Sequence, residues 1–279
     1  MTAKKGRQEN AFFSERVEFV ISRIESLSYL TTLDLKTMDG NVILNISYFP
    51  EDRIKDALRI LKPTFISPYV MSDRIIIARS GERIGDVDIP PGKIVIGTVC
   101  SVTINGIFLK AGIPVTSRFG GVVEIREGKP VRFSSLISYD GSSLDPLEIF
   151  IRGKMTDVLG VVKEGSGKIL ASFREIPIVC MDKAKNLAKK MKDQGISGIL
   201  LMGSPNKPLL EIPVGIDKVG ILIAGGLNPI AALEESAIST DSKAMSILYP
   251  YSGLRSFKEM VKYPGIKDAV KKNNREAII

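Results

Sequence analysis

Histidine is absent from all 279 residues, and this absence excludes several kinds of catalytic centre. A Ser-His-Asp triad, an HExxH zinc site and the two-histidine, one-carboxylate iron site of 2-oxoglutarate-dependent oxygenases all require an imidazole. The sequence also contains no Walker A loop, no Gly-x-Gly-x-x-Gly and no Gly-x-Ser-x-Gly motif. A nucleotide-binding fold and an α/β-hydrolase are therefore not indicated.

Tryptophan is absent as well, and aromatic residues make up only 6% of the chain, which does not favour recognition of bases by stacking. No apolar run reaches the length of a transmembrane helix, and the N-terminus lacks a signal-peptide pattern, so we expect no membrane association. The two cysteines, Cys100 and Cys180, have no metal-binding or redox spacing. We therefore expect a reducing compartment, the cytoplasm.

The charged residues that are present leave a net charge of +8. A basic balance permits binding of nucleic acid or of anionic ligands. Much of the excess lies near the C-terminus, at Lys262, Lys267, Lys271, Lys272 and Arg275. The alternative for these residues is a solvated basic tail.

The hydrophobic periodicity predicts the order strand, helix, strand, strand, helix, strand, and this order occurs twice. The first copy has its elements at 42–49, 52–61, 74–78, 93–96, 107–111 and 122–125, and the second at 168–176, 182–191, 199–202, 218–223, 228–233 and 244–249. Gly97 aligns with Gly220, and Asn105 aligns with Asn228. The pattern predicts an α+β fold with duplicated ferredoxin-like βαββαβ units.

The domain organisation follows from this repeat. We expect a disordered tail over 1–15, one folded body over 16–253, and a basic helical tail over 254–279. Within the body the copies span about 40–130 and 167–250, and a strand–helix insertion covers 130–166. Residues 12–30 have helical spacing, although a strand at 17–22 is an alternative because β-branched residues are frequent there. Pro63 is expected to end the first long helix of the repeat.

The segment 97–124 combines a strand, a turn of small polar residues, a helix start and an Arg-Gly-Gly corner. We expect Asn105 to cap the helix, and the free N–H groups there could face a negative ligand. The alternative is a tightly packed corner with glycine where a Cβ has no room. The second copy keeps the asparagine but has only Ile-Ala-Gly-Gly where the first has Cys-Ser-Val-Thr, so a site is expected in the first copy.

Candidate ligand-binding residues are therefore the polar, small and basic residues in and near this segment. They are Cys100, Ser101, Thr103, Asn105, Ser117, Arg118, Gly120, Gly121, Arg152 and Lys154. A dicarboxylate would need one bidentate arginine and backbone donors, and Arg118, which is followed closely by glycines, suits this best. The alternative is that Arg118 forms an ion pair with Glu124 or Asp145. We expect no catalytic residue, no metal ligand and no cofactor.

Four strings together are more specific than any of these signals. They are 100–106 (CSVTING), 112–121 (GIPVTSRFGG), 138–155 (SYDGSSLDPLEIFIRGKM) and 171–176 (ASFREI). This combination resembles the regulatory domain of the archaeal nitrogen repressor, NrpR, over roughly residues 16–251.

The resemblance implies a dimeric repressor of nitrogen-assimilation and nitrogen-fixation genes that senses 2-oxoglutarate as its effector. It also implies that Cys100 stands where the family has a cysteine involved in the response. Family members carry a winged-helix domain ahead of the regulatory domain, whereas about fifteen residues precede Arg16 here. The chain resembles the form without this DNA reader, which works beside a winged-helix paralogue and general transcription factors. We therefore expect no sequence-specific DNA reading by this chain itself.

Two other functions remain open from the sequence. One is an ACT-like module that senses an amino acid or another small molecule without a link to nitrogen control. The other is an enzyme with Cys100 as its nucleophile, which would need lysine or arginine to lower the thiol pKa because histidine is absent.

Overall fold

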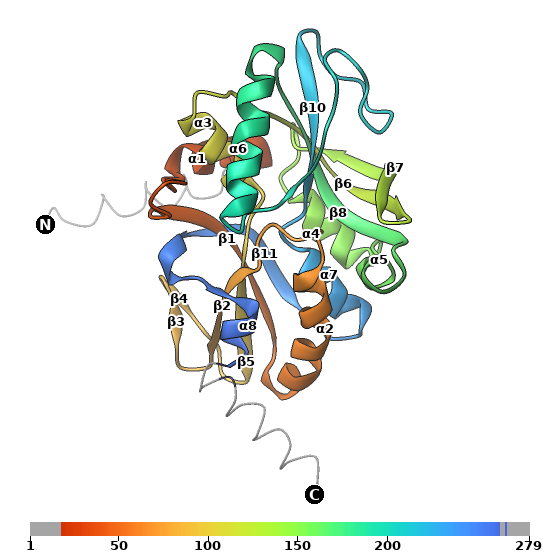
Figure 1. Ribbon diagram of the computed structural model, residues 1–279. Helices are drawn as coiled ribbons and strands as arrows, with labels where there is room; N and C mark the ends of the chain where they lie inside the picture. The colour runs from red at the N-terminus through yellow and green to blue at the C-terminus, as the bar shows by residue number, and fades with distance from the viewer. Residues whose placement is uncertain (1–17, 263–265, 267–279) are drawn as a thin grey trace, which may run out of the picture.

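A computed structural model describes residues 18–262 and 266, and the two ends of the chain that were expected to form tails lie largely outside these residues (Figure 1). The strands are β1 Asn41–Pro50, β2 Arg74–Arg79, β3 Arg83–Ile84, β4 Val87–Asp88, β5 Lys93–Val99, β6 Thr116–Arg126, β7 Lys129–Ser138, β8 Gly167–Pro177, β9 Ile199–Met202, β10 Lys218–Ala224, β11 Asp241–Pro250 and β12 Arg255–Ser256. The helices are α1 Val20–Leu30, α2 Ile54–Ile66, α3 Val102–Lys110, α4 Pro146–Arg152, α5 Val158–Glu164, α6 Met181–Asp193, α7 Asn228–Glu235 and α8 Phe257–Met260. The α+β class and the duplicated βαββαβ order are confirmed.

The two copies exchange their last strands. One sheet has the order β11-β1-β5-β2-β12, and the other has the order β7-β6-β8-β10-β9. The first strand of each copy therefore pairs with the fourth strand of the other copy: β1 with β11, and β8 with β6. All strand pairs in both sheets are antiparallel, which agrees with the ferredoxin-like pattern.

The helix that precedes each exchanged strand also packs with the other copy. Helix α7 of the second copy packs against α2 of the first, and the two lie side by side in Figure 1. Conversely, α3 and α6 contribute to the other main hydrophobic cluster. Each three-dimensional unit thus consists of three strands and one helix from one copy, completed by a helix and a strand from the other. Neither copy can form its sheet and core without the other.

Two local predictions are wrong, and packing explains each. Pro63 does not end α2, because Thr64 and Phe65 beyond it are buried and the Thr64 hydroxyl donates to the Ile60 carbonyl at 3.1 Å. Asn105 does not cap α3, which begins three residues earlier, at Val102. Tertiary burial outweighs the local signal at both positions.

The segments that flank and interrupt the repeat are part of the core. Residues 20–30 form a helix, as their spacing indicated. Strand β7 extends the second sheet, and Asp145 caps α4 by accepting from the Leu147 and Glu148 amides, as expected for its Asp-Pro start. The expected C-terminal tail begins inside the fold, since β12 pairs with β2 and the ring of Phe257 stacks on Phe65.

The exchange requires the chain to pass between units twice, after β5 and after β10. These two turns touch each other at what we call the central crossing, residues 99–103 and 224–228. A Cβ on Gly226 would overlap the Val99 carbonyl oxygen and would lie 2.6 Å from Asn45 Nδ2 and 3.2 Å from the Cα of Cys100. Glycine is needed here because two backbones approach directly.

We expect Gly226→Ala to lower the free energy of unfolding by about 1–3 kcal/mol, because the methyl group must push apart backbone that has no room to move. Gly203→Ala is the matched control, since its Cβ would find its nearest neighbour at an ordinary 3.4 Å. Chemical denaturation of both variants measures the difference. Equal stabilities would contradict the close approach at the central crossing.

Candidate functional site

The first turn of α3 leaves the central crossing as a buried polar segment. Strand β5 ends at Val99, and Cys100, Ser101 and Thr103 are all almost fully buried. Ser101 occupies the cap position of α3, but its side chain accepts no bond from the helix backbone. Its hydroxyl is used elsewhere, which makes this turn different from an ordinary capped helix start.

The partner of Ser101 is Arg174, in the middle of β8. Arg174 Nη1 donates to the Ser101 carbonyl oxygen at 2.7 Å, and Nη2 lies 2.9 Å from Ser101 Oγ. The Arg174 side chain is 0% exposed, and its Nε has no hydrogen-bond partner among residues 18–262 and 266. Within the same residues no carboxylate forms an ion pair with it. A buried guanidinium without a counter-charge is costly, and the burial lowers the pKa of Arg174.

Thr103 ties the same helical turn to the other sheet. The backbone amide of Ile43 in β1 donates to Thr103 Oγ1 at 3.1 Å, and Asn45 Oδ1 two residues on accepts from the Met245 amide of β11. The first turn of α3 is therefore held by one unit through Arg174 and by the other through Ile43. A change at Ser101 would therefore affect how the two units pack at their junction.

Cys100 lies in this junction as an unreactive thiol. Burial raises its pKa to about 11, and the lowering contribution of the nearby Arg174 charge is smaller. The fraction of thiolate at neutral pH is therefore very small. This environment argues against Cys100 as a nucleophile and suits a residue that packs beside a polar centre.

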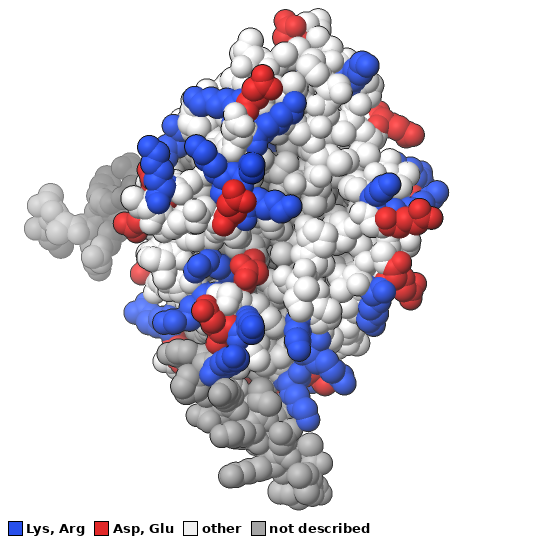
Figure 2. Space-filling view, viewed as in Figure 1, with Lys and Arg blue, Asp and Glu red and all other residues white. Residues whose placement is uncertain are grey.

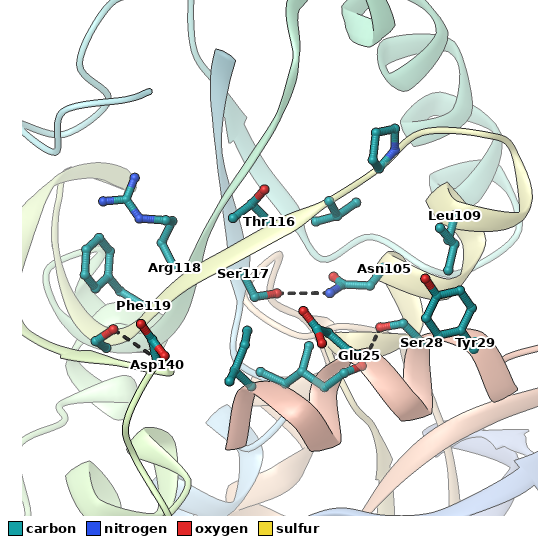
Figure 3. A pocket seen from close by; sticks show the side chains of 15 residues that line it. Glu25, Ser28, Tyr29, Asn105, Leu109, Thr116, Ser117, Arg118, Phe119 and Asp140 are labelled. Atoms are coloured by element: carbon teal, nitrogen blue, oxygen red, sulfur yellow. Dashed lines mark hydrogen bonds between the residues drawn. The ribbon is translucent and has the colours of Figure 1, made fainter. Parts of the chain in front are cut away.

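A pocket of about 700 Å³ opens between α1, α3 and β6, and Figure 3 shows its lining. On its floor Asn105 Nδ2 donates to Ser117 Oγ at 3.0 Å, and both residues are buried. Asn105 Oδ1 has no partner among the described residues. Glu25 of α1 points toward this Asn105–Ser117 pair from the opposite wall (Figure 3). We call this hollow the α1–β6 pocket.

Arg118 lines the same pocket, but its guanidinium is not free. Its Nη1 donates to Glu175 Oε1 at 2.5 Å, and the carboxylate of Glu175 is only 4% exposed. Figure 3 shows the guanidinium on the other side of β6 from the Asn105–Ser117 pair. The partner of Arg118 is thus neither Glu124 nor Asp145. Glu175 also accepts from the Gly215 amide at 3.1 Å, so Arg118 belongs to a structural network.

The remaining predicted residues do not join this site. Gly120 and Gly121 give room to neighbours, because a Cβ would overlap Pro146 in the first case and the Ser135 carbonyl in the second. Arg152 and Lys154 line a separate hollow beside α4 and β11. The structure therefore divides the predicted set into the central crossing (Cys100, Ser101, Thr103), the α1–β6 pocket (Asn105, Ser117, Arg118), a packed corner and a distant surface.

Two residues of interest escaped the sequence reasoning. Arg174 is a charged residue in the middle of a strand whose other residues are mostly apolar. This unusual position could have marked Arg174 as a candidate from the sequence. Glu25 lies on the polar side of a short amphipathic helix, where nothing in the sequence distinguishes it. Among the described residues no cluster of three or more acidic, cysteine or histidine side chains could hold a metal ion. None of the helices in the described part of the chain has the length and apolarity to cross a membrane.

The fold is an α+β domain built from two interlocked ferredoxin-like units. The family model for NrpR regulatory domains NRD1 and 2 matches residues 17–256, so the chain belongs to the NrpR regulatory-domain family. The resemblance that the four strings suggested is therefore confirmed.

Relatives and a solved structure agree with this assignment. The chain is 38% identical to the global nitrogen regulator NrpRI of Methanosarcina mazei over 90% of this chain and 77% of that protein. It is 34% identical to the global nitrogen regulator NrpR of Methanocaldococcus jannaschii over 88% of this chain, but spans only 41% of that longer protein. A crystal structure of a nitrogen repressor-like protein from Methanococcus jannaschii superimposes with a TM-score of 0.74 at 33% identity, covering 87% of this chain and all of that chain.

The contrast between the two cysteines is testable. In native protein at neutral pH we expect an alkylating reagent to modify Cys180, which is only half-buried, much faster than Cys100, whose thiol is buried and has a raised pKa. Peptide mass spectrometry over time measures both rates. In denaturant the two rates should converge. Modification of Cys100 at the rate of Cys180 in the native protein would revive the nucleophile hypothesis.

Proposed function

We propose that this member of the NrpR family is a nitrogen-responsive transcriptional regulator that binds 2-oxoglutarate at the central crossing and acts on genes through a DNA-binding partner. Membership in a family of nitrogen regulators is established by the family match and the relatives. Our proposal adds four points to this family membership: the effector, the partner, a dimeric state and action without enzymatic activity.

The observation that carries the effector proposal is the buried guanidinium of Arg174. It has an unused Nε donor and no carboxylate partner among the described residues, and it holds only Ser101. A carboxylate is the natural partner of such a group, because two parallel charge-assisted bonds satisfy the guanidinium. The α1–β6 pocket is a poorer place for a dianion, since Glu25 and Asp140 line it and its one lining arginine is already paired with Glu175.

Binding at Arg174 would change the structure because it must displace Ser101. The first turn of α3 would lose its hold on β8 while Thr103 still ties it to β1. A ligand that prefers the released state shifts the population toward it. Since α3 carries β6 into the second sheet, the shift would alter how the two interlocked units pack.

A basic surface supports action in a complex on DNA. Helix α6 carries five lysines and two aspartates over 13 residues, and Figure 2 shows Lys and Arg gathered over this part of the molecule. Such a surface attracts phosphate without reading sequence. Sequence selection would then come from a winged-helix paralogue or from general transcription factors.

We expect calorimetric titration to show heat with 2-oxoglutarate, and we expect Arg174→Met to weaken its affinity by about 10- to 100-fold, because bonds to a charged donor contribute about 1.5–3 kcal/mol. Arg174→Lys keeps the charge and should retain part of the affinity. Arg152→Met removes an exposed guanidinium from the distant surface and is the matched control. Circular dichroism confirms that each variant folds. Full affinity in a folded Arg174→Met protein would refute the assignment of the site.

A co-purification experiment tests the partner. We expect the chain to retain a winged-helix NrpR paralogue or a general transcription factor, and millimolar 2-oxoglutarate to weaken that complex in the wild type but not in Arg174→Met. Electrophoretic mobility shifts should show that the chain alone binds operator and scrambled DNA equally. Operator preference by the isolated chain would contradict the division of labour, and light scattering reports whether it is a dimer.

A further inference from the structure

We infer that the exposed side of helix α6 binds the phosphodiester backbone of double-stranded DNA, and that Lys185, Lys189 and Lys192 make the contacts. This inference rests on the proposed function, because it identifies where a regulator that acts in a complex on DNA would touch the duplex. It shares no residue with the effector site around Arg174. The two proposals can therefore fail separately.

The lysines of α6 all lie on the solvent side of the helix. Of its 13 residues only Ala184 and Met191 are buried, and the five exposed lysines are Lys183, Lys185, Lys189, Lys190 and Lys192. Residues three, four and seven apart share one side of a helix, so the lysines at 185, 189 and 192 form a stripe along it. Figure 2 shows Lys and Arg gathered over the region that α6 occupies in Figure 1.

These lysines have no counter-charge within the molecule. None of the five forms an ion pair with a carboxylate in the part of the chain that the structure describes, and the only acids of α6, Asp182 and Asp193, lie at its two ends. In α2, by contrast, Asp56 pairs with both Arg53 and Arg59. Like charges four residues apart destabilise a helix by about 0.2–0.5 kcal/mol per pair. Helix stability therefore does not account for the lysines of α6, whereas an external polyanion does.

Both ends of α6 are fastened, each to a different sheet. Before the helix, the Ile178 amide donates to the carbonyl of Asp217, which precedes β10, at 3.0 Å. After the helix, the Gln194 carbonyl accepts at 3.0 Å from the hydroxyl of Tyr251, which follows β11. The backbone beneath the lysines is thus held in place before any ligand arrives. Binding then has to order only side chains, which reduces its entropic cost.

The chemistry of the stripe suits phosphate better than a protein surface. Helix α6 contains no arginine and no aromatic residue, the residue types that supply most of the binding energy in protein interfaces, where lysine is depleted. A lysine ammonium binds phosphate as a point charge and needs no particular sequence. The stripe is about 10 Å long at 1.5 Å per residue, which spans about three phosphates of one DNA strand.

The test measures the affinity of the full chain for a short fluorescent DNA duplex by anisotropy over a range of salt concentrations. We expect the triple variant Lys185→Gln, Lys189→Gln, Lys192→Gln to bind about tenfold or more weakly at low salt. The slope of log affinity against log salt should fall by about 2–3, since each phosphate contact contributes about 0.9. Glutamine has nearly the helix propensity of lysine, so the variant should fold, which circular dichroism checks.

The matched control removes the same charge around α5, away from α6 (Figure 1), with Lys129→Gln, Lys163→Gln and Lys168→Gln, all of which are exposed. Equal loss of DNA affinity in the two triple variants would overturn the inference, as would wild-type affinity in the α6 variant. An α6 variant that keeps its DNA affinity but loses a co-purified partner would make α6 a protein contact instead. Calorimetry with 2-oxoglutarate on the same proteins separates the proposals, since a wild type without heat refutes the effector site alone.

Discussion

The whole architecture depends on the contact of two backbone turns at the central crossing. Because the fourth strands are exchanged, the chain must cross between the sheets twice, and both crossings pass through one place where Gly226 touches Val99 and Cys100. Each sheet and each main hydrophobic cluster contains elements of both copies, so neither copy forms a core by itself. Any change in the crossing therefore acts on both units at once. A regulatory domain gains from this arrangement, since a small local displacement becomes a change in the packing of the units.

The two crossings follow the equivalent strands β5 and β10 but differ in chemistry. In the second, Asn228 bonds only to backbone, at both the amide and carbonyl of Leu170 and at the Tyr69 carbonyl, and all of its polar atoms are satisfied. In the first, Ser101 is held by a guanidinium that has no counter-charge among the described residues, and Asn105 has an unpaired oxygen. Buried polar groups left unsatisfied are rare in stable folds and collect where a ligand or a movement uses them. The second crossing is thus an internal comparison for the first. The polar atoms of Asn228 in the second crossing are all bonded, whereas the first crossing retains buried polar atoms without a partner among the described residues.

Much of the fold was predictable from the sequence, because the repeat shows in the spacing of apolar residues. The strand predicted at 168–176 is buried continuously over 169–176, and the predicted face of the helix at 182–191 places Ala184 and Met191 in the core. The exchange of strands was not predictable, since a strand has the same pattern whichever sheet it joins. For the site, the structure brings Cys100, Ser101 and Thr103 of the first-copy turn to the central crossing, and ligand binding there stays a prediction. Arg118 reads as a free anion ligand until the fold brings Glu175 beside it, 57 residues away. Glu25 lines the α1–β6 pocket only because α1 packs on α3.

Arg174 bears on how an anion could act through one helical turn. Its guanidinium holds Ser101 at the backbone carbonyl and at the hydroxyl, while Thr103, two residues on, is held by the Ile43 amide of the other sheet. An anion that took over the bonds of Arg174 would release Ser101 from β8 and leave Thr103 tied to β1. The turn would then be held by one unit only, so the proposed effector would act on the packing of both units through the few residues that connect them.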